Sequence, residues 1–162
     1  MEDKDLRRIV RETVNGYLSS SRKLTLDTAL ALSEAIKQRA RELGVKAVIC
    51  VADAGGHPIT VQSMDDAYIA SYDVAVNKAY TVVALKMSTS VLKPLAQPGA
   101  SLYGIQFTNG GRIVIFGGGE PLCVKGGEIL GGLGVSGGSE EQDTALAAYG
   151  LEYFQKQMHG GL

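Results

Sequence analysis

The sequence predicts one domain of mixed α/β structure (α+β), in which helices cover the faces of a mainly antiparallel sheet. Apolar residues repeat at helical spacing near both ends of the chain. Short apolar runs separated by glycine turns fill much of the remainder and indicate strands joined as hairpins. The 162 residues, 45% of them hydrophobic, can bury one core, and no repeat or linker-like stretch divides them.

The first two predicted elements are helices. Helical spacing of apolar side chains predicts an amphipathic helix over residues 4–19, which the serines at 19–21 end. A second helix begins near Thr25, whose hydroxyl suits the N-cap, with the carboxylate of Asp27 in its first turn. Gly44 is a natural residue for the position just beyond the end of this helix.

A hairpin and a third helix follow. Residues 45–51 are a continuous apolar run, residues 58–64 alternate in character, and a tight turn over 53–56 joins these two strands. Residues 65–87 contain no Gly or Pro, and their small side chains indicate a helix packed closely on a flat surface. Ser88 is placed to cap a short helix that Pro94 constrains.

The second half predicts four more strands and a last helix. The strands cover residues 102–107, 112–116, 121–125 and 128–135. The turns Asn109-Gly110-Gly111 and Gly126-Gly127 are strong hairpin signals. The helix over residues 139–156 begins with a capping box of Ser139 and Gln142.

Glycine is concentrated in this half, with 13 of the 21 glycines between Tyr103 and Gly138. Glycine within strand-like sequence costs stability, because it loses the most conformational freedom on folding. We therefore expect the backbone here to turn sharply, or to approach a ligand or another subunit closely.

Composition excludes several classes of protein. The net charge is −1 with no basic block, so nucleic acid is not an expected partner. The charged N-terminus lacks the apolar core of a signal peptide, and no apolar run reaches membrane-spanning length, so we expect a cytoplasmic protein without membrane contact. Cys50 and Cys123 lie in apolar runs and are expected to be buried free thiols, with a disulfide between them as the alternative.

Two glycine motifs resemble catalytic or cofactor signatures. Residues 132–137 fit G-x-G-x-x-G, but no second parallel strand follows the helix, which argues against a dinucleotide fold. Residues 134–138 fit G-x-S-x-G, with Asp143 and His159 downstream. These two would lie roughly 24 Å apart along a helix, which argues against a triad. We therefore expect no catalytic set, and the scattered His and Cys residues predict no metal site.

Three further side chains are candidates for function. His57, beside a turn, is either a solvated side chain or the one imidazole outside the tail that could bind a haem iron. Lys78 is either a solvated lysine or a cation at the wall of a pocket. Arg112 is expected to pair with a carboxylate such as Glu120 or Asp143, in a structural rather than a catalytic ion pair.

Several segments in order resemble the GlcG/HbpS/PduO C-terminal-domain family. They are Val51-Ala52-Asp53-Ala54-Gly55-Gly56-His57-Pro58, Met64-Asp65-Asp66-Ala67, Asn77-Lys78-Ala79-Tyr80-Thr81, Pro98-Gly99, Leu102-Tyr103-Gly104, residues 110–122 and residues 132–143. The resemblance covers roughly residues 24–154. It implies a profilin-like three-layer α/β/α sandwich with a five-stranded antiparallel sheet, and a homo-oligomer from dimer up to octamer in which the glycine-rich strands pack between subunits.

The resemblance also implies the domain limits and the ligand site. Residues 1–23 would be an N-terminal helical extension, 24–157 the core and 158–162 a loose tail. The residues that it implies contact a ligand are Met64, Asp65, Lys78, Arg112, Gly117, Gly118 and Glu120. Haem binders of the family supply a histidine to the iron, and the first two predicted helices here contain none. His57 is then the default iron ligand. The haem would lie in a hydrophobic slot against the helix over residues 65–87.

The function that the resemblance implies is non-enzymatic binding of a small molecule or a tetrapyrrole, related to haem or cobalamin. Relatives link this function to bacterial use of propanediol, other small diols or hydroxy acids, including inside microcompartments. Some relatives are fused to a cobalamin adenosyltransferase domain, and the adenosyltransferase activity belongs to that other domain. Two alternatives stay open. One is an enzyme acting on a small carbonyl or hydroxy acid, with Lys78 and Arg112 holding its carboxylate, and the other is a structural assembly protein without a ligand.

Overall fold

The computed structural model describes residues 3–20, 23–124 and 126–159. The helices are α1 (Asp3–Ser20), α2 (Leu26–Glu42), α3 (Ile69–Leu85), α4 (Thr89–Leu95) and α5 (Glu140–His159), with 3-10 turns η1 (Ile105–Phe107) and η2 (Asn109–Gly111). The strands are β1 (Val48–Asp53), β2 (Pro58–Ser63), β3 (Gly119–Cys123) and β4 (Ile129–Ser136).

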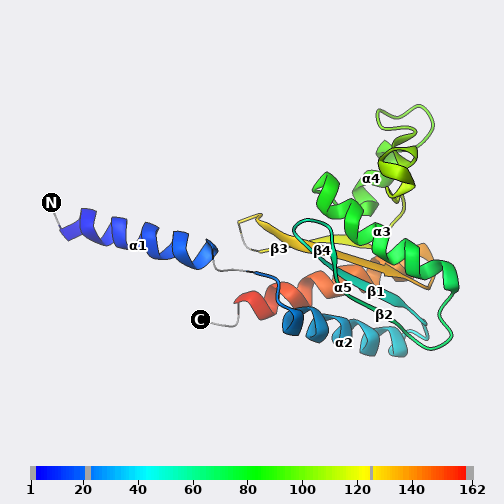
Figure 1. Ribbon diagram of the computed structural model, residues 1–162, viewed down its shortest axis with the longest axis horizontal. Helices are drawn as coiled ribbons and strands as arrows, with labels where there is room; N and C mark the ends of the chain where they lie inside the picture. The colour runs from blue at the N-terminus through cyan, green and yellow to red at the C-terminus, as the bar shows by residue number, and fades with distance from the viewer. Residues whose placement is uncertain (1–2, 21–22, 125, 160–162) are drawn as a thin grey trace.

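The described strands form one antiparallel sheet of four, in the order β2-β1-β4-β3. Helices α2 and α5 pack together over one face, and α3 crosses the other (Figure 1). The predicted mixed α/β fold with an antiparallel sheet is confirmed. The expected fifth strand is absent from the described part of the chain.

Two predicted strands are wrong. Residues 102–107 form turns and η1, and residues 112–116 contain no strand. The predicted hairpin at Asn109-Gly110-Gly111 is also wrong, because no strand of the described chain flanks this turn on either side. The three residues have positive φ, at 51°, 65° and 78°, and form η2.

The segment that follows η2 is held by helix α3 instead of by a strand. The Thr81 hydroxyl accepts a hydrogen bond from the Val114 N–H (3.0 Å) and also lies 3.3 Å from the Arg112 carbonyl. Ile113 and Val114 are buried, so this apolar run reflects packing on the helix rather than pairing in the sheet.

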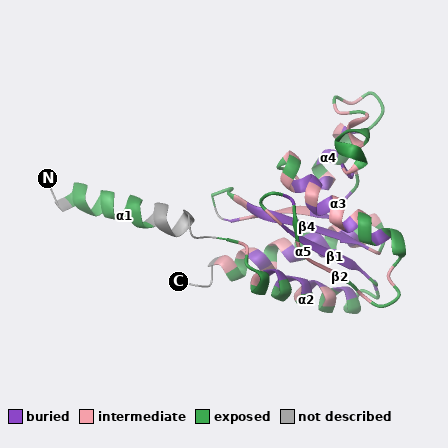
Figure 2. Cartoon of the chain, in the orientation of Figure 1, coloured by how far each residue is buried: buried purple, intermediate pink, exposed green. Residues whose placement is uncertain are grey.

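The sheet separates two hydrophobic cores. The larger lies under α2 and α5 and includes Leu32, Ile49, Leu133 and Phe154. The smaller, under α3, is built from Val48, Cys50, Ala52, Ala75 and Ala79. Figure 2 shows the inner strands and the inward sides of these helices as the buried part of the molecule.

Glycines of β4 let α3 lie directly on the sheet. A Cβ built on Gly134 would collide with the backbone carbonyl of Ala75, and one on Gly132 with that of Ala79. The close approach that the glycine density predicted is therefore present, and at these positions the neighbour is a helix of the same chain rather than another subunit.

Local signals placed the helix ends well. Thr25 and Ser88 cap α2 and α4 through their hydroxyls, and Ser139 and Gln142 form the predicted capping box. Helix α3 begins at Ile69, later than predicted, because residue 66 has a positive φ of 62° and the chain turns there. Helix α5 runs to His159, so part of the predicted loose tail is helical, while residues 160–162 lie outside the described residues.

The margins of the fold have two further features. Pro58 begins β2 and Pro121 lies within β3, so both outer strands of the sheet carry a proline.

Helix α1 extends away from the sheet and its covering helices (Figure 1). No helix in the described ranges combines the length and apolarity needed to cross a membrane.

Candidate functional site

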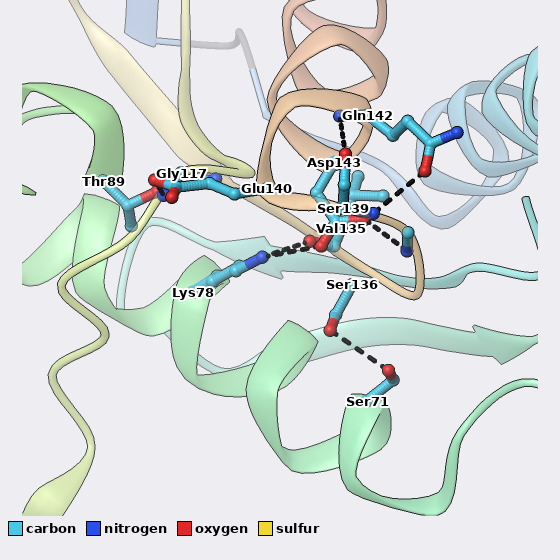
Figure 3. A network of polar contacts seen from close by, with 12 residues as sticks. Ser71, Lys78, Thr89, Gly117, Val135, Ser136, Ser139, Glu140, Gln142 and Asp143 are labelled. Atoms are coloured by element: carbon cyan, nitrogen blue, oxygen red, sulfur yellow. Dashed lines mark hydrogen bonds and ion pairs between the residues drawn. The ribbon is translucent and has the colours of Figure 1, made fainter.

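The deepest polar cluster surrounds Lys78, in the middle of α3 (Figure 3). Its side chain is fully buried, and Nζ donates to the Val135 carbonyl (2.8 Å) and to Asp143 Oδ2 (3.1 Å). Nζ also lies 5.0 Å from the centroid of the Phe116 ring. Asp143, near the start of α5, accepts the Gly138 N–H through its other oxygen (2.8 Å). The pair thus joins α3, β4 and α5.

Burial lowers the pKa of the Lys78 ammonium from its ordinary value, and the carboxylates of Asp143 and Glu140 oppose this shift. A buried charge requires a partner, and here Asp143 and a carbonyl supply it. The solvated-lysine alternative is therefore wrong. In this conformation a substrate has no access to Nζ, so Lys78 cannot hold a carboxylate as the enzyme hypothesis requires.

A glycine loop covers this ion pair. The Gly117 N–H donates to Glu140 Oε1 (2.8 Å), and Glu140 also pairs with Lys93 (2.5 Å). A Cβ on Gly118 would lie 2.6 Å from Lys78 Nζ. Of the expected ligand residues, Lys78, Gly117 and Gly118 are thus brought together, around an ion pair rather than a pocket.

The serine of the G-x-S-x-G motif has a structural partner. The Ser136 hydroxyl donates to that of Ser71 (3.2 Å), in a buried bond between β4 and α3. Asp143 is engaged by Lys78 and Gly138, so the carboxylate that the motif would need is committed elsewhere. A hydrolase triad is not assembled by Ser136 and Asp143.

A second cluster lies on the surface at the β1–β2 turn and is centred on His57. Asp53 Oδ1 accepts the N–H groups of Gly55 (2.8 Å) and His57 (3.0 Å) and lies 3.5 Å from His57 Nδ1. The N–H of His57 is the main reason why the pKa of Asp53 lies below its ordinary value. The imidazole is 82% exposed. A carboxylate beside Nδ1 can orient the ring, and Nε2 of this exposed imidazole takes part in none of the hydrogen bonds described for its turn, as a ligand nitrogen requires.

Tyr80 of α3 connects this turn to Arg112. A Cβ on Gly56 would lie 3.0 Å from the Tyr80 ring, so the turn rests against that ring. The Arg112 guanidinium stacks 3.6 Å from the centroid of the ring, and Asn109 Nδ2 donates to the phenol oxygen (3.1 Å). The expected pairing of Arg112 with Glu120 or Asp143 is wrong: Asp143 pairs with Lys78, and Arg112 packs on an aromatic face.

Exposed aromatic side chains continue from this cluster along the segment that contains η1 and η2. Phe107 is 81% exposed and Tyr103 is 62% exposed.

Met64, Asp65 and Glu120 lie apart from these clusters. Met64 and Asp65 line a groove of about 540 Å³ at the end of α2. Its other lining residues are Lys37, Arg41, Gly44, Val45, Lys46, Ser63 and Asp66. Glu120 is half-buried in β3, where burial raises its pKa. The structure therefore divides the expected ligand set among separate places.

Sequence reasoning missed Asp53, Tyr80 and Asn109 as site residues. Asp53 was recognisable, because a carboxylate at the start of a turn commonly accepts the following N–H groups. Tyr80 and Asn109 meet only through the tertiary fold. Within the described residues, no group of three or more His, Cys, Asp or Glu side chains gathers as a metal site would require.

The fold and its polar clusters define a layered α/β domain, with a buried lysine–aspartate pair behind a glycine loop and an exposed histidine at its first hairpin. A model of the family described as "Haem degrading protein HbpS-like" matches residues 24–152, so the chain belongs to the HbpS-like family. The resemblance seen in the sequence is confirmed.

The chain is also similar to two curated proteins and to one solved structure. A Citrobacter freundii protein described as an uncharacterized 15.0 kDa protein in the dhaT-dhaS intergenic region is 45% identical over 133 residues, 82% of this chain and 93% of the relative. The corrinoid adenosyltransferase PduO of the same organism is 38% identical over 160 residues, which cover 93% of this chain but only 48% of PduO. The crystal structure of a PduOC:heme complex is 39% identical, with a TM-score of 0.77, over 81% of this chain and 94% of that chain.

Proposed function

We propose that this domain binds haem without catalysing a reaction, and that His57 is the ligand to the iron. The observation that carries the proposal is the geometry of the β1–β2 turn, where Asp53 lies 3.5 Å from Nδ1 of an imidazole that is 82% exposed. A histidine oriented by a carboxylate on one nitrogen is the usual arrangement for binding a metal through the other. Haem would supply an iron, and the imidazole of His57 would be the side chain that holds it.

The surroundings of His57 suit the rest of a haem molecule. The guanidinium of Arg112, fixed on the Tyr80 ring, is a suitable partner for a propionate carboxylate. The exposed rings of Tyr103 and Phe107 offer apolar surface to a flat macrocycle. Haem therefore fits the chemistry of the side chains at this surface.

The relatives support haem as the ligand. A solved relative is described as a haem complex and the family model as a haem degrading protein, and the second description differs from the proposal in naming a reaction. The burial of Lys78 argues against the enzyme hypothesis, in which Lys78 and Arg112 together hold a substrate carboxylate. We further propose that the domain acts as a cytoplasmic homo-oligomer in bacterial use of small diols or hydroxy acids, in keeping with its similarity to about half of PduO.

Titration of the pure protein with hemin tests this proposal. We expect a shifted Soret band that saturates at one hemin per chain, and we expect the His57→Ala variant to lose the shift. The matched control is His159→Ala, which should titrate like the original protein. A Soret shift unchanged in His57→Ala would remove His57 as the ligand, and the absence of any shift with the original protein would remove haem.

Arg112 gives an independent arm of the same test. A charge-assisted hydrogen bond contributes about 1.5–3 kcal/mol, so Arg112→Gln should weaken hemin affinity roughly tenfold or more while leaving the position of the Soret band unchanged. An affinity equal to that of the original protein would show that Arg112 does not hold a propionate.

A further inference from the structure

Helix α1 has an apolar stripe that the rest of the described chain leaves uncovered. Leu6, Ile9, Val10 and Val14 follow helical spacing and are 44–52% exposed, and Figure 2 shows the coloured part of this helix as exposed. An isolated helix of 18 residues is only marginally stable in water, and most helical stability in proteins comes from packing an apolar face. The stripe therefore needs a partner surface.

A suitable surface lies between α2 and α5. A groove of about 220 Å³ is lined mainly by apolar surface. Its lining residues are Asp27, Thr28, Ala31, Leu32, Tyr153, Phe154 and Gln157. Helices α2 and α5 thus present a small, mainly apolar groove to solvent.

The charges at the two surfaces are complementary. Arg7 and Arg11 border the stripe of α1, where they line a shallow hollow with Leu6, Val10 and Val14. The groove contains the carboxylate of Asp27. An apolar ridge with a basic border matches an apolar groove with an acidic one, and this complementarity would set the direction in which the helix docks.

We propose that α1 of one copy of the chain packs into the α2–α5 groove of a second copy, and that the two copies exchange these helices reciprocally. Leu24 packs against the core and Thr25 caps α2, so residues 21–23 alone separate the end of α1 from anchored chain. Helix α1 extends away from the α2–α5 layer of its own chain (Figure 1), which leaves its stripe accessible to a second copy. A reciprocal exchange closes as a two-fold dimer.

A disulfide trapping experiment between two differently tagged copies tests the exchange. Both carry Cys123→Ser, while the buried Cys50 remains; one carries Val10→Cys on the stripe and the other Ala31→Cys in the groove. Mixing and mild oxidation should give a disulfide heterodimer in most of the protein. The matched control, Arg8→Cys in place of Val10→Cys on the same helix, should give at least tenfold less.

Three results would overturn the proposal. A disulfide between two Val10→Cys copies, at the expense of the heterodimer, would show that α1 pairs with α1. A single chain carrying both substitutions that crosslinks only within itself would show that α1 folds onto its own groove. Equal yields from Val10→Cys and Arg8→Cys would show that the contact is not specific.

A second measurement reports the same contact without cysteines. Leu6→Glu places a charge on the stripe, and we expect it to lower the dimer fraction at least tenfold in sedimentation at fixed concentration. Far-ultraviolet circular dichroism checks that α2–α5 stay folded. A well-folded Leu6→Glu variant with the original mass distribution would count against the docking.

Discussion

Lys78 Nζ lies 3.1 Å from Asp143 Oδ2 across 65 positions of sequence, and both side chains are almost completely shielded from solvent. A pair of this kind costs much desolvation, and its net stabilisation over an apolar pair is small. Its value is geometric, because it fixes α3, β4 and α5 relative to one another and places the glycine loop over them.

Removing one partner of this pair should destabilise the fold strongly. In Asp143→Asn the Lys78 ammonium is left buried without its countercharge, and we expect a loss of about 3–5 kcal/mol in the free energy of unfolding. The double variant Lys78→Met/Asp143→Asn should recover a large part of that loss. Urea unfolding followed by circular dichroism measures both, and a single-variant cost below about 1 kcal/mol would contradict the role given to the pair.

Adding one methyl group at Gly134 should disrupt the contact between the sheet and α3. The new Cβ would meet the Ala75 carbonyl, and neither backbone can move easily, so we expect a cost of about 3 kcal/mol or more. Gly111→Ala is the control, since its φ is +78° but its Cβ would meet nothing within 4 Å. There we expect about 1–2 kcal/mol from backbone strain alone. Equal losses in the two variants would show that α3 is not pressed on the sheet.

The two cysteines should differ in reactivity. Both thiols are free, and burial raises the pKa of Cys50 to about 12. At pH 8 the Cys50 thiol is therefore protonated and shielded, and iodoacetamide should leave it unmodified until urea unfolds the protein. Mass spectrometry of peptides containing Cys50 or Cys123 checks this. Rapid modification of Cys50 in the native protein would be inconsistent with its burial between β1 and α3.

Acid should loosen the β1–β2 turn. The pKa of Asp53 is lowered in the fold relative to its ordinary value of 3.8, chiefly by the His57 N–H, so its contribution to stability is present above pH 3.8. That contribution is lost as the pH falls through the lower, folded-state pKa. Amide NMR shifts of Gly55 and His57 should titrate in that acidic range, and Asp53→Asn should abolish the titration. A titration that persists in Asp53→Asn would assign the effect to another group.

Signals confined to a few neighbouring residues were sufficient to predict the starts of α2, α4 and α5 and the first hairpin. Ser139 and Gln142 form their capping box from residues three apart, so no tertiary information is needed. The same is true of Thr25, which caps α2 within its own first turn.

The wrong strand predictions concern residues that are buried by a helix rather than by pairing in the sheet. Ile113 and Val114 are apolar because they pack against α3, and an apolar run does not reveal which element covers it. The pairing of Lys78 with Asp143 and the stacking of Arg112 on Tyr80 depend on the arrangement of α3, β4 and α5 in space. A chemistry-based choice of candidate residues found Lys78 and Arg112 but not their partners.

Prolines in both outer strands limit the association of copies of this chain through the edges of the sheet. Pro58 and Pro121 lack an amide hydrogen. A strand of another molecule that paired with β2 or β3 would therefore lack one backbone hydrogen-bond donor at each proline. Such gaps discourage fibril-like stacking of one molecule on the next. The edges of the sheet are thereby poorly suited to join copies of this chain, which leaves the helical layers and surface loops as the surfaces for contact.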